Sequence, residues 1–239
     1  MNIRIAAVAG SVLLSVGFSV VAAPYTLPAW SFTGSGFGSY NGSSANPSQL
    51  YMTITGPSSG PTSESAYATS SADVLIITSN TTYTLTFFAD LFGPAGGSYG
   101  LLANGVGVAG TYLSTFDPWT NYSASFTTSG ASDSRVGTPL RAQFGMGASF
   151  MGGGNLTVTN IALDVSPVLP KLTILRTNNS TVRLSWSTNF NWYSLESASN
   201  VTDSIWLTVT NVPSSSGSEL VVDFELLLPD QRVFRLRQP

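Results

Sequence analysis

The sequence predicts an all-β protein whose strands pack into sandwiches, and three observations support this fold class. Short runs in which apolar and polar side chains alternate recur along most of the chain. Clusters of Gly, Ser, Asn and Pro separate these runs, as turns separate strands. No segment keeps a helical period over several turns. Many short strands with regular turn signals are typical of a β-sandwich or a jelly roll.

The clearest strand is expected within residues 80–92. Large apolar side chains alternate there with threonines, so one face of an extended chain is apolar and the other carries hydroxyls. We therefore expect a core strand with its threonines on the outer face. The apolar set is Tyr83, Leu85 and Phe87, and the threonine set is Thr82, Thr84 and Thr86.

Further strands follow from the same alternation. The pair Asn104-Gly105 joins two of them and predicts a two-residue hairpin, because a type I′ turn needs positive φ at both central positions. The expected strands are residues 29–33, 49–55, 72–77, 82–88, 99–103, 106–112, 122–127, 141–146 and 156–165, then 172–175, 182–186, 193–197, 206–209, 220–224 and 233–236.

Composition excludes several function classes. The chain has 239 residues, of which 43% are hydrophobic and only 9% are charged, and its net charge is −3. Phosphate binding needs clustered Lys and Arg, so nucleic acid is not expected as a partner. The chain contains no Cys and no His. Disulfides, the usual zinc and haem sites, a Cys nucleophile and a Ser-His-Asp relay are therefore excluded.

The first 23 residues read as a secretory signal peptide. One early Arg4 precedes an apolar run, and small residues follow before Pro24, which predicts cleavage after Ala22 or Ala23. The alternative is an uncleaved membrane anchor. No later stretch is long and apolar enough to span a bilayer, so we expect a secreted, extracellular or cell-surface protein.

A domain boundary is predicted at residues 166–170, where a Ser-Pro-Val-Leu-Pro segment forms a stiff linker. Residues 24–165 carry six acids against two arginines, a net charge of −4, whereas six acids and six basic residues balance in residues 171–239. This shift in charge separates two domains.

Three blocks of the first domain resemble the galactose-binding-like jelly roll of secreted bacterial carbohydrate-binding modules. They are residues 81–87 (TTYTLTF), 119–129 (WTNYSASFTTS) and 153–164 (GGNLTVTNIALD), with the Asn-Gly hairpin between the first two. The resemblance implies a jelly-roll β-sandwich over residues 24–165. It also implies a glycan or another surface polymer as partner.

The tail resembles a C-terminal module of exported proteins from environmental bacteria. The resemblance rests on Leu184-Ser-Trp186, residues 193–201, Trp206 and residues 233–237. It implies a unit that displays or anchors the protein and carries no catalytic residue. Six expected strands in this length indicate a small immunoglobulin-like or fibronectin-like β-sandwich. Trp186 and Trp206 are expected in its core, whereas Arg235 and Arg237 are expected to face water.

Carbohydrate binding needs exposed aromatic rings with polar groups nearby. The tentative binding residues cluster in one loop and the start of the next strand, where binding residues concentrate. Tyr40 and Trp30 are further aromatic candidates. In the alternative interpretation, Trp119 and Tyr122 pack as caps on the core. The tentative set is Phe116, Asp117, Trp119, Asn121 and Tyr122.

The acids Asp90, Asp117 and Asp133 could support glycoside hydrolysis only if two of them faced each other across a cleft. Nothing in the sequence pairs them, so we expect no enzyme activity and no cofactor, with a structural calcium ion as the one metal to consider. The expected function is a secreted, non-catalytic binding module. The alternative is a structural or adhesive surface protein without a small ligand, and a glycoside hydrolase is the third option.

Overall fold

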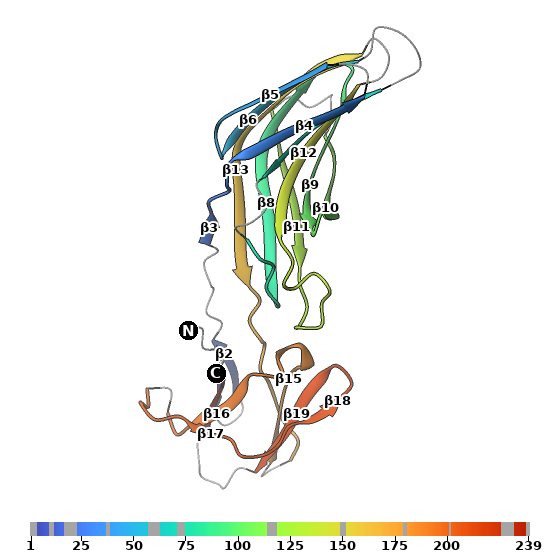
Figure 1. The fold of residues 1–239 in the computed structure, drawn as a ribbon. Coiled ribbons are helices and arrows are strands. Elements are labelled where there is room, and N and C mark those ends of the chain that lie inside the picture. Colours follow the sequence, from blue (N-terminus) through green and yellow to red (C-terminus); the bar gives the residue numbers. More distant parts are fainter. Residues whose placement is uncertain are drawn as a thin grey trace. The chain divides into compact units, whose positions relative to one another are not determined.

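The structure, a computed structural model, is all-β, as the sequence predicts (Figure 1). The one helical element among the residues described is a single 3-10 turn, Thr188–Phe190. For residues 4–9, 12–16 and 23 only the backbone is described. The described ranges are 4–9, 12–16, 23–36, 39–56, 63–70, 75–113, 119–148, 152–178, 181–200, 202–225 and 232–237.

The chain forms two compact units, residues 22–167 and residues 168–239 together with 1–21. Each unit has its own cluster of buried hydrophobic side chains. Strand β13 (Gly153–Pro167) runs through the first two residues of the predicted linker. The domain bounds 24–165 and 171–239, and the removal of residues 1–23, stay predictions.

Two antiparallel sheets build the 22–167 unit and share its core. We name them the β8 sheet and the β12 sheet. The β8 sheet has the order β11 (Thr120–Thr127), β8 (Thr81–Phe92), β13, β6 (Gln49–Thr55) and β5 (Ser39–Asn46), and β3 (Ala23–Tyr25) also pairs with β13. The β12 sheet has the order β10 (Val106–Leu113), β9 (Gly96–Ala103), β12 (Leu140–Ala148), β7 (Glu64–Ser70) and β4 (Trp30–Gly36).

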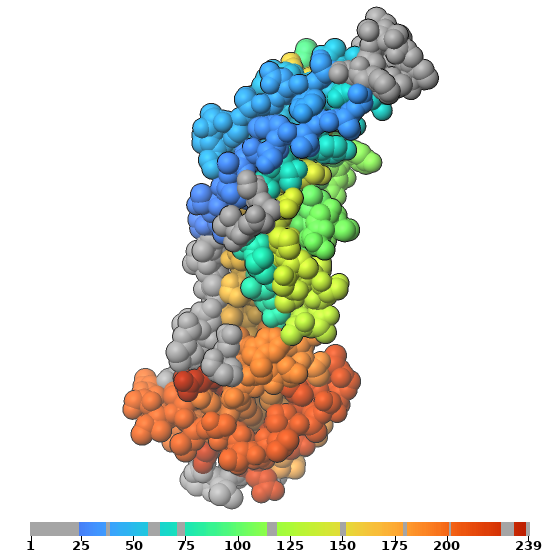
Figure 2. All heavy atoms as spheres, in the orientation of Figure 1, coloured from blue at the N-terminus to red at the C-terminus, as the bar shows by residue number. Residues whose placement is uncertain are grey.

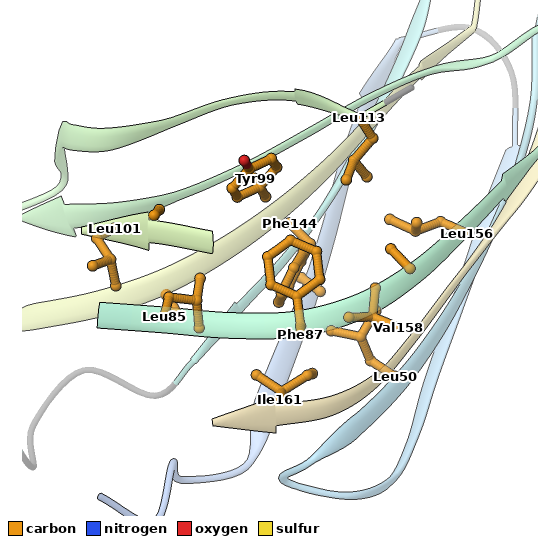
Figure 3. Packing of buried hydrophobic residues seen from close by; sticks show 14 of the residues in the cluster. Leu50, Leu85, Phe87, Tyr99, Leu101, Leu113, Phe144, Leu156, Val158 and Ile161 are labelled. Carbon is orange, nitrogen blue, oxygen red and sulfur yellow. The ribbon is translucent and has the colours of Figure 1, made fainter. Parts of the chain in front are cut away.

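Strand β8 supplies the centre of this core, which confirms the alternation in residues 80–92. Tyr83, Leu85 and Phe87 are all buried. The Phe87 ring meets Phe144 of β12 with centroids 4.8 Å apart and Tyr99 of β9 at 4.9 Å, both edge to face. Figure 3 shows these rings gathered between strands of the two sheets. Aromatic packing between the sheets therefore fixes β8 in place.

The threonine face of β8 lies on the outer surface, as expected. Its hydroxyls bond across to the neighbouring edge strand β11: Thr82 to Thr127 at 2.9 Å and Thr84 to Ser125 at 3.0 Å. Such cross-strand pairs stabilise a sheet without any charge. We call these two pairs the hydroxyl ladder.

One open side of the sandwich is closed by β4 and β5, the edge strands of the two sheets, which contact each other. The Tyr40 ring of β5 lies over Gly34 of β4, and the Phe32 ring of β4 lies over Gly42 of β5. A Cβ at either glycine would overlap the facing ring, so both positions need glycine. Figure 2 shows this part of the chain, in blue, as a continuous surface.

The Asn104-Gly105 hairpin is confirmed. Both residues have positive φ, 49° and 79°, and Ala103 pairs with Val106 across the turn.

Strands β5 and β7 are absent from the sequence predictions, because neither contains a run of large apolar residues. β5 reads SYNGSSAN and is almost wholly exposed, while β7 reads ESAYATS and turns small alanines inward. The strand expected at residues 72–77 is wrong for residues 75–77, which hold only an isolated bridge between Ile76 and Pro139. Residues 72–74 lie outside the described residues.

The second unit also has two antiparallel sheets around one core. The first has the order β14 (Thr173–Arg176), β15 (Thr181–Ser187), β19 (Glu219–Glu225) and β18 (Ser214–Ser216). The second has the order β17 (Leu207–Thr208), β16 (Ser194–Ala198), β20 (Arg232–Arg237), β1 (Arg4–Ala9) and β2 (Val12–Val16).

Trp186 is buried in this core, as predicted, but two other expectations are wrong. Trp206 lies outside the buried cluster, and Arg235, expected to face water, is buried. The Arg235 guanidinium lies 4.2 Å from the centroid of the Trp206 ring, and its Nε donates to Glu196 at 2.6 Å. An ion pair and a cation–π contact thus stabilise the buried position of a cationic side chain that strand alternation alone predicts to be exposed.

No helix in the described part of the chain is both long and apolar enough to cross a membrane.

Candidate functional site

A shallow, open groove lies on the β8 sheet, across β11, β8 and β13. Its volume is about 450 Å³. Three neighbouring strands of one sheet supply its walls, so the groove belongs to the rigid part of the unit. The lining residues are Thr86, Phe87, Phe88, Asn121, Tyr122, Ser123 and Asn160.

Strand register brings the polar and aromatic groups of β8 and β11 together. Asn121 lies opposite Phe88, and Ser123 lies opposite Thr86. Alternation turns these four side chains to the outer face, because Phe87 between them points into the core. The Phe88 ring is 37% exposed.

A β-bulge on β13 adds the amide of Asn160. The pairing of β13 with β8 shifts between Thr159 and Ala162, and Asn160 in this interval has a φ of 53°. Asn tolerates this left-handed conformation better than most residues, and a bulge re-aims side chains. The backbone N–H of Ile161 donates to the carbonyl of Ser48 at 3.0 Å, so the bulge is fixed to the turn between β5 and β6.

The floor of the groove is held by the core. Tyr122 stacks on Phe87 with centroids 5.5 Å apart and an interplanar angle of 16°. The Tyr99 hydroxyl donates to the Ser123 carbonyl at 3.1 Å, which ties β11 to the β12 sheet. Burial, and secondarily the nearby Tyr122, raises the pKa of Tyr99, so this hydroxyl keeps its proton as a donor.

The lining suits an uncharged ligand rich in hydroxyl groups. Phe88 offers an apolar ring, Asn121 and Asn160 offer amides that both donate and accept, and Thr86 and Ser123 offer hydroxyls. No Asp, Glu, Lys or Arg is among the described lining residues. The groove can thus bind by stacking and neutral hydrogen bonds, while a charged ligand would find no counter-ion in it.

Two of the five tentative binding residues, Asn121 and Tyr122, line the groove. Phe116 and Asp117 lie outside the described residues. Trp119 is 53% exposed with a φ of 54°, just before β11, and it is not part of the lining.

Tyr122 matches the alternative interpretation, since it is half-buried and packs as a cap on Phe87. The exposed Trp119 does not match it. Trp30 is a core residue whose indole N–H donates to the Pro47 carbonyl at 2.9 Å, and Tyr40 covers Gly34 at the closed edge.

Sequence reasoning missed Thr86, Phe88, Ser123 and Asn160. For Phe88 a signal was present, because the alternation that buries Phe87 places the next residue on the threonine face. A large ring among threonines on an outer face is a binding candidate. The bulge at Asn160 has no comparable signal in the sequence.

The acids considered for hydrolysis are not brought together as a catalytic pair. Asp133 is held by Arg135, whose Nε and Nη2 donate to its two oxygens at 2.9 and 2.6 Å. Asp90 lies on the outer face of β8 opposite Thr157 of β13. Asp117 is outside the described residues.

The described residues contain no group of three or more acidic side chains that could hold a metal ion. A structural calcium ion held by backbone carbonyls and one or two Asp side chains stays a prediction.

The Asp133 ion pair gives a prediction for acid stability. The hydrogen bond from Arg135, helped by backbone N–H groups of Arg135 and Ser129, holds the pKa of Asp133 well below its usual range. A lowered folded-state pKa adds stability above the unfolded value of about 4, and this stability is lost as the pH falls further. We expect Asp133→Ala to lower the free energy of unfolding at pH 7 by about 2 kcal/mol, and by less at pH 3.

Urea unfolding at both pH values measures this difference. Asp90→Ala is the control, since that carboxylate forms no ion pair with any residue that the structure describes. An equal loss at pH 7 and pH 3 would contradict the role of the Asp133 charge.

No protein-family model matches the sequence, and no curated protein matches it. Several solved structures are similar in part. The adhesin domain of Epf from Streptococcus pyogenes is 10% identical with a TM-score of 0.41, covering 75% of this chain and 65% of that chain. An apo cyclase from Fischerella sp. is 14% identical with a TM-score of 0.38, covering 64% of this chain and 91% of its own.

The glycoside hydrolase domain of Endo-D, Spr0440, from Streptococcus pneumoniae R6 is 14% identical with a TM-score of 0.36, covering 86% of this chain and 34% of that chain. At such identities and TM-scores these similarities carry no argument about function.

Proposed function

We propose that this chain is a secreted, non-catalytic binding protein whose 22–167 unit holds an uncharged glycan in the groove on the β8 sheet. The observation that carries the proposal is the exposed Phe88 ring, set between the amides of Asn121 and Asn160 on a rigid sheet. Sugar rings have apolar faces that stack on aromatic rings and hydroxyls at their edges. Amide groups beside the ring can donate to and accept from those hydroxyls.

We also propose that the 22–167 unit is a jelly-roll module and that the second unit is an immunoglobulin-like carrier. The two sheets that share one core in each unit support this assignment. The apolar leader of residues 1–23 supports export to the cell surface or the medium.

A binding screen tests the proposal. The chain is titrated with soluble neutral polysaccharides and oligosaccharides in a calorimeter, beside the variants Phe88→Ala and Phe92→Ala. Both phenylalanines lie on the outer face of β8, and Phe92 is 72% exposed but outside the groove lining, so it is a matched control. We expect Phe88→Ala to weaken binding about tenfold, the effect of losing one stacking contact, and Phe92→Ala to leave it within about twofold.

The variant Trp119→Ala tests whether the binding site lies in the groove or in the neighbouring loop. Because Trp119 is outside the lining, its removal is expected to change affinity by less than about threefold. A larger loss in Trp119→Ala than in Phe88→Ala would move the site to the loop. No binding to any polysaccharide by a folded chain would overturn the proposal.

The second candidate is an adhesive or structural role without a small ligand. Exposed rings outside the groove favour it, above all Tyr112, which is 82% exposed, and Phe92. Equal effects of Phe88→Ala and Phe92→Ala on attachment to surfaces, without saccharide binding, would support this role.

A further inference from the structure

A second exposed aromatic ring lies beyond the groove on the same face of the β8 sheet. Tyr51 of β6 is 42% exposed, and its neighbours Leu50 and Met52 are buried. Strand alternation therefore turns Tyr51 to the outer face of the sheet, where Phe88 of β8 also lies. The two rings thus offer stacking surfaces to the same side of one rigid sheet.

Strand register sets how far apart these rings lie. Phe88 pairs with Thr159 of β13. Two residues earlier on β13, Thr157 pairs with Tyr51 of β6. Tyr51 is thus two strands across and two residues along from Phe88, a separation of about 12 Å between their backbone positions. Stacked rings have centroids about 4.5 to 7 Å apart, so one sugar ring cannot stack on both.

Neutral polar side chains lie between the two rings. Thr157 and Thr159 turn outward from β13, since Val158 between them is buried. Asn160 follows on the bulge that is fixed to the turn between β5 and β6. Threonine hydroxyls and an asparagine amide can donate to and accept from sugar hydroxyls. The space between the rings therefore continues the chemistry of the groove lining.

One acidic side chain lies beside this path. Asp90 of β8 pairs with Thr157 and is on the outer face, since Ala89 and Leu91 beside it are buried. Strands β8, β13 and β6 contain no Lys and no Arg. A carboxylate accepts hydrogen bonds from hydroxyl groups but repels an anion. A neutral polymer therefore suits this face better than one built from uronic acids.

The described positions beyond both rings carry exposed polar side chains. Ser43 of β5 lies opposite Tyr51, and Asn121 of β11 lies opposite Phe88. Strands β5 and β11 are the two edges of the β8 sheet. A long ligand that lies over both rings can therefore continue past each of them toward an edge of the sheet.

We propose that the ligand is an extended, neutral, β-1,4-linked polysaccharide that crosses β8, β13 and β6 obliquely and stacks separate sugars on Phe88 and Tyr51. The inference rests on the proposed function, because it extends the groove around Phe88. A β-1,4-linked chain is an extended ribbon that presents successive sugars to one face of a sheet. An α-1,4-linked chain coils, so its next sugars turn away from the second ring.

The dependence of affinity on chain length tests this proposal. β-1,4-linked glucose and mannose oligosaccharides, from disaccharide to hexasaccharide, are titrated in a calorimeter. We expect affinity to rise about tenfold once the oligosaccharide reaches both rings, the effect of one added stacking contact. Tyr51→Ala should abolish this rise and leave the binding of the shortest oligosaccharides unchanged. α-1,4-linked glucose oligosaccharides should show no such rise.

Two variants serve as controls. Tyr51→Phe keeps the ring and should keep the rise with chain length. Tyr67→Ala removes a ring of similar exposure from β7, which belongs to the other sheet, and should change affinity by less than about twofold.

The outcomes separate this proposal from the proposed function. An affinity that does not depend on chain length, while Phe88→Ala still weakens binding, would overturn the path to Tyr51 and leave the groove as the site. Equal losses for short and long oligosaccharides in Tyr51→Ala would overturn it too. Binding of other neutral saccharides but of no β-1,4-linked one would overturn the ligand class. No binding of any saccharide would overturn both proposals.

Discussion

Replacing Phe87 by Ala is expected to lower the free energy of unfolding of the 22–167 unit by about 4 kcal/mol. The Phe87 ring is 1% exposed and contacts the rings of Phe144 and Tyr99 of the facing sheet (Figure 3). It also stacks on Tyr122 of its own sheet. Its loss leaves a cavity where the two sheets meet. Urea unfolding, followed by circular dichroism, measures the change.

Phe87→Leu is the control, with an expected loss of about 1.5 kcal/mol because most of the apolar volume stays. Since Phe87 also supports Tyr122 in the groove floor, Phe87→Ala should weaken the proposed glycan binding even where the unit remains folded. A loss below about 1 kcal/mol would mean that the sheets do not meet at this ring.

Replacing Glu196 by Ala is expected to lower the free energy of unfolding of the second unit by about 4 kcal/mol. The Glu196 side chain is buried and accepts from Arg235 at 2.6 Å and from Arg237 at 3.2 Å. Without it, the buried Arg235 guanidinium keeps its charge but loses its anion. Breaking one partner of a buried pair is costly for this reason. Thermal unfolding, followed by tryptophan fluorescence, gives the measurement.

The double variant Glu196→Leu with Arg235→Met separates pairing from packing. It removes both charges and keeps apolar volume, so it should recover at least half of the loss. Arg183→Ala provides the surface control, because its ion pair with Asp223 is half-exposed on both sides and its loss should change stability little. A double variant as unstable as Glu196→Ala would show that volume rather than charge is decisive.

The all-β class and the strongest strands could be predicted from the sequence, because they rest on local patterns. The alternation of apolar residues and threonines predicts β8, and the pair Asn104-Gly105 predicts the β9–β10 hairpin. β5 could not be found in this way, since it is held by pairing with β6 and by the contact of its Gly42 with Phe32 of the facing edge strand β4. Such long-range contacts produce no recognisable pattern within a short run of residues.

Two of the seven groove residues, Asn121 and Tyr122, could be predicted, because they lie in the loop-and-strand segment rich in aromatic and amide groups. Asn160 could not, since its position depends on a bulge that only the pairing of β13 with β8 defines. Arg235 could not be predicted for the same reason. Strand alternation predicts that it is exposed to solvent, whereas its contacts with Glu196 and Trp206, which are distant in sequence, accompany its burial.

The hydroxyl ladder between β8 and β11 has a consequence for the environment in which this protein can work. Neutral hydroxyls hold water by hydrogen bonds that added salt does not screen. With 9% of its residues charged, the chain relies little on ionic repulsion to stay dispersed. Its outer sheet should thus remain hydrated in brine and in fresh water alike.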